Sequence, residues 1–163
     1  MEELVLRSAV PADLEFLLPL MRDSWNLHHD HLPDSFPPFD LTSNRLLLRA
    51  AMDRTDALVL TAWLGEELVG FAHLTLRQLF LSETPQRVVS VESLYVCPQC
   101  RGQGIGRALM ERTQAWGTQS GASRIELTVW AFNEQARHFY DQMGLRPRHT
   151  VMELPLQPGK EKD

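Results

Sequence analysis

The chain has 163 residues, of which 44% are hydrophobic and 23% are charged, an ordinary balance for one globular domain. This composition excludes a disordered chain, a collagen-like repeat and a coiled-coil rod. No stretch approaches the ~20 apolar residues of a membrane helix. Acidic residues interrupt the start of the chain, so we expect neither a signal peptide nor a membrane partner. The formal net charge of −5 leaves no basic footprint for a nucleic acid, and the sparse use of cysteine suits the cytoplasm.

Apolar periodicity and turn residues predict the order β-α-α-β-β-β-α-β-α-β, an α/β fold without internal repeats. We expect strands at 4–10, 57–64, 67–77, 87–96, 123–130 and 145–154. We expect helices at about 11–25, 42–53, 104–118 and 133–143. Between the first two helices, residues 26–40 are predicted to form a loop that carries three prolines and three histidines. The domain is predicted to cover residues 1–156, and the tail 157–163 to be disordered.

A glycine-rich turn, Arg101-Gly102-Gln103-Gly104-Ile105-Gly106, joins the strand that ends at Val96 to the next predicted helix. Backbone N–H groups at a helix start lack partners within the helix, and glycines let the main chain approach a ligand, so a pyrophosphate fits such a turn. The other interpretation is a tight turn that needs glycine only for its angles. The dinucleotide fingerprint fails, because Arg107 or Leu109 stands at its last position, and no Gly-Lys-Ser/Thr of a nucleotide-triphosphate loop follows.

Three motifs in the expected order resemble those of the GNAT N-acetyltransferase superfamily. Arg101-x-x-Gly104-x-Gly106 after Leu94-Tyr95-Val96 is similar to its acetyl-CoA signature. Asn133-x-x-Ala136-x-x-Phe139-Tyr140 followed by Met143-Gly144-Leu145 resembles its second motif, and Leu6-Arg7-x-Ala9 with Asp13 resembles its usual start. The resemblance implies a single GNAT-like α/β domain with helices on both faces of a mixed, mostly antiparallel sheet. It also implies an acetyl-CoA-dependent N-acetyltransferase that needs no metal.

The resemblance assigns cofactor-binding roles to the matching positions. The main chain of residues 94–96 is implied to pair with the pantetheine arm of acetyl-CoA, like an added strand. The amides of residues 102–107 are implied to hold the pyrophosphate, with added charge from Arg101 and Arg107. Asn133 is implied to bond the cofactor arm, although an Asn in that position is also an ordinary N-cap. The implied set is Leu94, Tyr95, Val96, Arg101, Gly102, Gln103, Gly104, Ile105, Gly106, Arg107, Asn133 and Tyr140.

Tyr140 is the candidate general acid for the transfer reaction. Amine attack on a thioester expels a thiolate, which leaves more easily when a proton is delivered to it. A phenol at the end of the short predicted helix can supply that proton. The alternative is a core tyrosine buried by its apolar neighbours.

Glu92 is the candidate base, because the attacking amine must lose a proton before it can react. It stands two residues before Leu94, so regular alternation places these two side chains on one face and Ser93 and Tyr95 on the other. The alternative is a charge on a half-exposed strand face. A main-chain N–H of Tyr95 or Val96 is expected to hold the oxyanion of the tetrahedral intermediate.

Two further clusters support rival hypotheses. Cys97-x-x-Cys100 lies just before a predicted helix, whose N-terminus would lower a thiol pKa and favour redox chemistry. The segment with His28, His29 and His31 together with Asp30 and Asp34 has the residue types of a metal site. We expect it instead to cover the acceptor site, with Phe36 and Phe39 as apolar walls and the acids attracting a cationic amine.

The acceptor is predicted to be a primary amine of a small molecule, because no separate recognition domain is present. A homodimer is an expectation from the resemblance. A catalytically silent CoA-binding sensor is the alternative function, and a thiol redox protein is a distant third. His73, which alternates with apolar neighbours on a predicted strand, is expected to be a packing residue.

Overall fold

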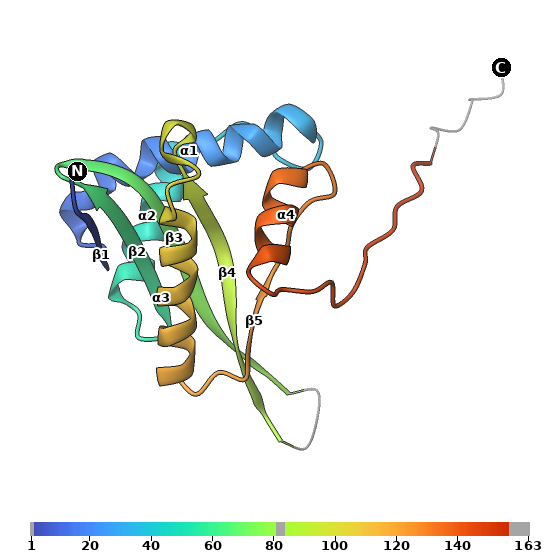
Figure 1. Ribbon diagram of the computed structural model, residues 1–163. Helices are drawn as coiled ribbons and strands as arrows, with labels where there is room; N and C mark the ends of the chain where they lie inside the picture. Colours follow the sequence, from blue (N-terminus) through green and yellow to red (C-terminus); the bar gives the residue numbers. More distant parts are fainter. Residues whose placement is uncertain (1, 81–83, 157–163) are drawn as a thin grey trace. The chain divides into compact units, whose positions relative to one another are not determined.

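The computed structural model describes residues 2–80 and 84–156, so the tail predicted at 157–163 lies outside the described residues. The chain divides between Thr128 and Val129 into two compact units. In chain order, the first contains β1 (Leu4–Ser8), η1 (Pro11–Asp13), α1 (Leu14–His31), α2 (Leu41–Asp53), β2 (Ala57–Leu64), β3 (Glu67–Leu79), β4 (Gln86–Val96), η2 (Pro98–Cys100), α3 (Ile105–Gln119) and β5 (Arg124–Leu127) (Figure 1). The second contains α4 (Glu134–Gln142).

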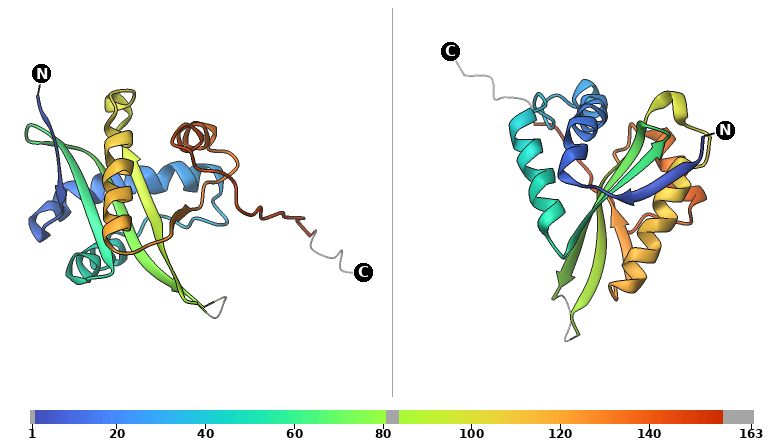
Figure 2. Two further views of the ribbon diagram at one scale, coloured as in Figure 1. Left: turned by 60° about the horizontal axis from the view of Figure 1, so that its bottom comes forward. Right: turned by 90° about the vertical axis from the view of Figure 1, so that its left-hand side faces the viewer.

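The five strands form one sheet in the order β1-β2-β3-β4-β5. All neighbours are antiparallel except β4 and β5, which run parallel, so the predicted mixed and mostly antiparallel sheet is confirmed. Helices α1 and α2 cover one face and α3 covers the other (Figure 2). Each face has its own apolar core. Leu17, Leu48 and Phe71 belong to the core under α1 and α2, and Val69, Leu74 and Leu109 belong to the core under α3.

Helix α1 is longer than predicted. The expected loop over 26–40 is wrong for its first six residues, because α1 continues through His31. No proline or glycine lies between Trp25 and Pro33, and the Nδ1 atoms of His28 and His31 lie 2.9 and 2.8 Å from the carbonyl oxygens of Ser24 and Leu27, four residues earlier. The histidines that were expected on a loop therefore lie on the last turns of a helix.

The strand predicted at 145–154 is not formed among the residues that the structure describes, so the predicted order loses its last strand. The apolar side chains of this segment are instead at least 82% exposed, namely Val151, Met152, Leu154 and Leu156. A strand is stable only when its backbone pairs with a neighbour, and sequence alternation alone does not supply that neighbour.

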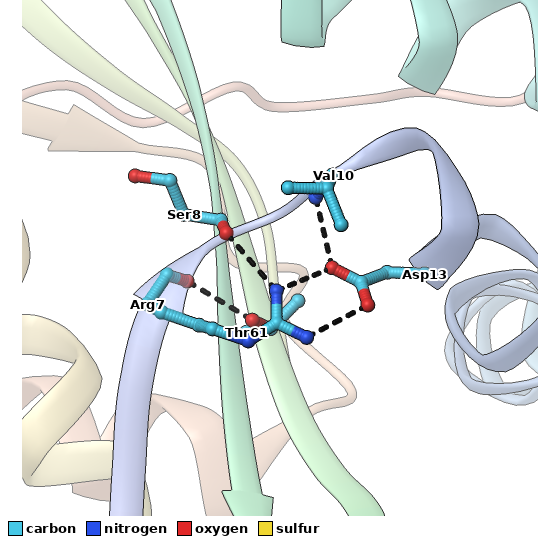
Figure 3. Close-up of polar contacts among 5 residues, drawn as sticks. All are labelled: Arg7, Ser8, Val10, Asp13 and Thr61. Atoms are coloured by element: carbon cyan, nitrogen blue, oxygen red, sulfur yellow. Dashed lines mark hydrogen bonds and ion pairs between the residues drawn. The ribbon is translucent and has the colours of Figure 1, made fainter.

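An ion pair joins β1 to the start of α1 (Figure 3). The Arg7 guanidinium donates to both carboxylate oxygens of Asp13, at 2.6 and 2.8 Å, and the Val10 amide donates to the same carboxylate at 2.8 Å. The hydrogen bonds from Arg7 hold the pKa of the buried Asp13 carboxyl below its usual value. Thr61 of β2 donates its hydroxyl to the Arg7 carbonyl, so the contact also ties the first strand to the sheet.

Candidate active site

Strand β4 carries a β-bulge at Glu92. His73 of β3 pairs with Ser93, but the next residue, Leu74, pairs with Val91, so Glu92 is an extra residue without a partner. The pairing of β4 with β5 ends at the same place, at Val91, and β4 continues beyond it (Figure 1). Residues 92–96 therefore have a neighbouring strand on the β3 side, and none on the other side among the described strands.

The ladder with β3 determines which amides point to this free edge. The Cys97 amide donates to the Val69 carbonyl at 2.9 Å. This contact continues the β3–β4 register, in which the neighbouring pair is Gly70 with Val96. Hydrogen-bonded pairs alternate along an antiparallel ladder. The amides of Tyr95 and Ser93 therefore point to β3, and those of Leu94 and Val96 point to the free edge. The predicted main-chain contact thus fits Leu94 and Val96, and the Tyr95 amide is the wrong donor for an oxyanion.

The glycine turn follows directly and leads into α3. Gly102 and Gly104 have φ values of +76° and +83°, the left-handed region that favours glycine, so the turn does need glycine for its angles. The first helical hydrogen bond runs from the Ala108 amide to the Gly104 carbonyl at 2.9 Å. The amides of residues 105–107 precede it and have no acceptor within the helix. Ile105, 2% exposed, anchors this helix start in the core under α3.

The two predicted arginines have different surroundings. The Arg101 Nε donates to the Val96 carbonyl at 3.0 Å, and its guanidinium lies 5.5 Å from the centre of the Tyr95 ring. Its charge is therefore held at the end of β4. Arg107 is exposed in the first turn of α3, and Gln103 donates a weak 3.4 Å hydrogen bond to the Gln99 carbonyl.

The bulge changes the faces expected for β4. Val89 and Val91 pack in the core under α3, and so do Leu94 and Val96, which is possible only with one extra residue between the two pairs. The Thr75 hydroxyl donates to the Glu92 carboxylate at 2.6 Å. Thr75 follows Leu74 on β3, and Leu74 lies in the core under α3. Because successive side chains of a strand point to opposite faces, Thr75 faces α1 and α2. The expectation that Glu92 and Leu94 share a face is therefore wrong.

His73 was assigned by sequence to packing, and it is buried on the same face as Glu92. Burial lowers the pKa of its imidazole, and the charge of Glu92 acts in the opposite direction. Sequence alternation alone could not have found this pair, because nothing in the residue pattern marks a bulge. The structure also shows Asp23 of α1 acting electrostatically on Tyr95, a residue that sequence reasoning missed.

Asn133 and Tyr140 lie in the second unit. The Asn133 side chain accepts a hydrogen bond from the Ala136 amide at 3.1 Å, so it is the N-cap of α4. Tyr140 lies in the last turn, where the Leu145 amide donates to its carbonyl at 3.0 Å and closes the helix. The Tyr140 side chain contacts Phe139, and burial raises the pKa of its phenol to about 12. The phenol is therefore protonated at neutral pH.

The two cysteines do not have the environment of a redox pair. Both are free buried thiols in the core under α3. Burial, together with a hydrogen bond that the Cys97 thiol donates to Cys100, raises the pKa of Cys97 to about 11. The expected lowering of a thiol pKa by the helix is wrong for Cys97, because η2 and the glycine turn stand between this thiol and the first amides of α3.

The segment between α1 and α2 is held by aromatic contacts. The Trp25 ring meets Phe36 and Phe39 at centroid distances of 5.3 and 6.5 Å, and its indole N–H donates to the Pro37 carbonyl at 2.7 Å. The predicted apolar walls thus pack against Trp25. Within residues 2–80 and 84–156, no group of three or more His, Cys, Asp or Glu side chains is arranged to hold a metal.

Comparison with known proteins identifies relatives of this chain. The Acetyltransferase (GNAT) family matches residues 24–145. An aminoglycoside N(6')-acetyltransferase type 1 from Stenotrophomonas maltophilia is 29% identical over 157 residues, 94% of this chain and 95% of the relative. A thialysine N-epsilon-acetyltransferase from Mus musculus is 32% identical over 80 residues, 49% of this chain and 45% of that protein.

Solved structures share the fold. A tetramutant of the BH1408 protein from Bacillus halodurans superposes with a TM-score of 0.87 at 30% identity, covering 93% of this chain and 99% of that one. The structure of AAC(6')-Iy in complex with the bisubstrate analog CoA-S-monomethyl-acetylneamine has a TM-score of 0.76 at 18% identity, over 96% of this chain and 99% of that one. Among the described helices, none combines the length and apolar character that a bilayer span requires.

Proposed function

Because this chain belongs to the Acetyltransferase (GNAT) family of acetyl-CoA-dependent N-acetyltransferases, we propose that it acetylates a primary amine of a small cationic molecule, by direct transfer in a ternary complex. One observation carries this proposal. The free edge of β4 and the open amides at the start of α3 lie next to each other in the chain and are linked by Arg101. An amide-rich arm that ends in a pyrophosphate matches both features.

In this mechanism the cofactor arm lies along β4 as an added strand. The Leu94 and Val96 amides and the Leu94 carbonyl supply the main-chain contacts, and the amides of residues 105–107 receive the pyrophosphate. Arg107 adds charge from the first turn of α3. Asn133, already occupied as the N-cap of α4, offers its remaining amide hydrogens to the arm.

The transfer step balances without a metal or redox partner. The neutral amine nitrogen attacks the thioester carbonyl, and a free-edge amide of β4 holds the oxyanion that forms. The carbon–sulfur bond then breaks, and Tyr140 delivers its proton to the departing thiolate. Glu92 takes the proton that the amine loses, directly or through one water.

The acceptor class is supported by charge and by the relatives. Three of the relatives act, by their names, on an aminoglycoside, on thialysine and on streptothricin, which are small molecules. The chain itself carries a net charge of −5. Asp23, Asp30 and Asp34 place negative charge on α1 and the segment after it, where a cationic amine would be attracted.

We further propose that residues 1–156 act as one domain in the cytoplasm, in keeping with the two free thiols.

We also propose a homodimer, and the exposed apolar segment with Val151, Met152, Leu154 and Leu156 supports it. Size-exclusion chromatography with light scattering tests the dimer, and a chain ending at residue 148 should run as a monomer.

The experiment that tests the activity is CoA release with a panel of amines. We expect turnover with at least one aminoglycoside or diamine, and a loss of roughly 100-fold in kcat for Tyr140→Phe with acetyl-CoA affinity unchanged. Phe139→Leu is the matched control on α4. If acetyl-CoA raises the melting temperature but no amine gives turnover, the chain is a CoA-binding sensor instead.

A further inference from the structure

His73 lies at the one point where the regular pairing of β3 and β4 fails. It stands opposite the bulge, so Glu92 and Ser93 of β4 together face this single residue of β3. Two residues further along β3 and on the same face, the Thr75 hydroxyl holds the Glu92 carboxylate at 2.6 Å. The carboxylate and the imidazole are therefore cross-strand neighbours.

The surroundings of His73 keep it neutral. It is 6% exposed, and this burial lowers the pKa of its imidazole. The face of the sheet on which His73 and Glu92 lie is covered by apolar side chains of α1 and α2, namely Leu14, Leu17, Leu18, Met21, Leu48 and Ala51. The charged groups that act on it are Glu92 from β4 and Arg54 from the end of α2, and the remaining titratable side chain of β4 on this face is the phenol of Tyr95.

A neutral imidazole beside a carboxylate can store a proton that the carboxylate collects. A carboxylate alone is a poor resting place for the proton of an ammonium group, because its pKa lies far below that of the amine. An imidazole binds the proton more tightly, and the adjacent negative charge stabilises the imidazolium that forms.

We propose that His73 is a positioning residue of the acetyl transfer, which accepts from Glu92 the proton that Glu92 removes from the amine. The Glu92 carboxylate takes the proton from the amine nitrogen and passes it through one bridging water to a ring nitrogen of His73. Glu92 returns to its ionised form, and His73 becomes an imidazolium until the proton leaves to solvent with product release. The inference rests on the proposed role of Glu92 as the base.

The test compares His73→Gln with Glu92→Gln, and uses the exposed His149→Gln as the matched control. For the wild type we expect kcat/KM to fall as the pH drops through the pKa of His73, below the ordinary value of about 6.5. In His73→Gln this acidic limb should disappear and kcat should fall roughly tenfold, with KM for both substrates unchanged. His149→Gln should keep the wild-type profile.

The two proposals fail in different ways. If Glu92→Gln keeps full turnover, the proposed base is wrong. If Glu92→Gln is inactive while His73→Gln keeps both kcat and the acidic limb, the base stands and the inference about His73 is overturned. If His73→Gln does not fold, the pKa of His73 is measured instead by NMR titration of the wild type and of Glu92→Gln. The pKa of His73 should be lower in Glu92→Gln, and an unchanged value contradicts the coupling.

Discussion

The two halves of β4 differ in what their backbone and side chains do. From Val88 to Val91 the strand pairs on both sides, with β3 and with β5, and its side chains are buried. From Ser93 to Val96 it pairs with β3, and its other edge has no described strand beside it. One inserted residue separates the halves. A single bulge can thus turn the end of a core strand into a binding edge without adding a loop.

The largest effect is expected from removing one free-edge amide. Leu94→Pro deletes an N–H that the β3 ladder does not use, so the protein should fold while CoA release falls roughly 100-fold. Tyr95→Pro deletes a ladder amide and should cost about 3 kcal/mol of unfolding free energy. Thermal melts and turnover separate the two variants. Equal loss of folding in both would show that the edge assignment is wrong.

A change in the paired half should alter stability alone. Val89 is fully buried under α3. Val89→Ala removes two buried carbon atoms and should lower the unfolding free energy by about 2 kcal/mol, measured by urea denaturation. Its kcat/KM at low temperature should equal that of the wild type. A matching loss of turnover would contradict the division of β4 into two halves.

The glycine turn offers a matched pair of variants. Gly104 and Gly121, at the two ends of α3, have φ values of +83° and +69°, and in both cases a Cβ would meet nothing within 4 Å. A valine at either position strains the backbone equally. Gly104→Val should also raise the Kd for acetyl-CoA at least tenfold by calorimetry, because it stands where the pyrophosphate would approach. Similar Kd values for the two variants would remove the turn from the binding site.

The smallest effect on activity is expected far from the bulge, at β1. In Asp13→Asn the pair with Arg7 is lost, at a cost of about 2 kcal/mol, since Arg7 is 41% exposed and solvent weakens the pair. The pKa of Asp13 is lowered in the folded state, so its stabilisation is present above the unfolded pKa and is lost as the pH falls through the folded pKa. The stability gap between wild type and variant should therefore close in acid, with turnover per folded molecule unchanged.

Sequence reasoning predicted the helix after the glycine turn and the strands of the sheet, since these have strong apolar periodicity. It could not predict the bulge at Glu92, because an extra residue leaves the residue types unchanged and only reverses the faces of those that follow. It also ended α1 too early at Trp25, where the polar residues that follow continue the helix. The prediction of a strand at 145–154 failed for another reason. Strand pairing depends on a neighbouring strand, which the alternation of apolar and polar residues does not reveal.

The buried thiols have a practical consequence for the assay. CoA release is measured with disulfide reagents that react with thiolates, and a thiol with a pKa of about 11 is ionised to only about one part in ten thousand at neutral pH. Cys97 and the buried Cys100 should therefore stay silent while the protein is folded, so every coloured product counts a released cofactor. Unfolding exposes both, and the same reagent then reports how many molecules have opened. One absorbance trace can follow catalysis and integrity together.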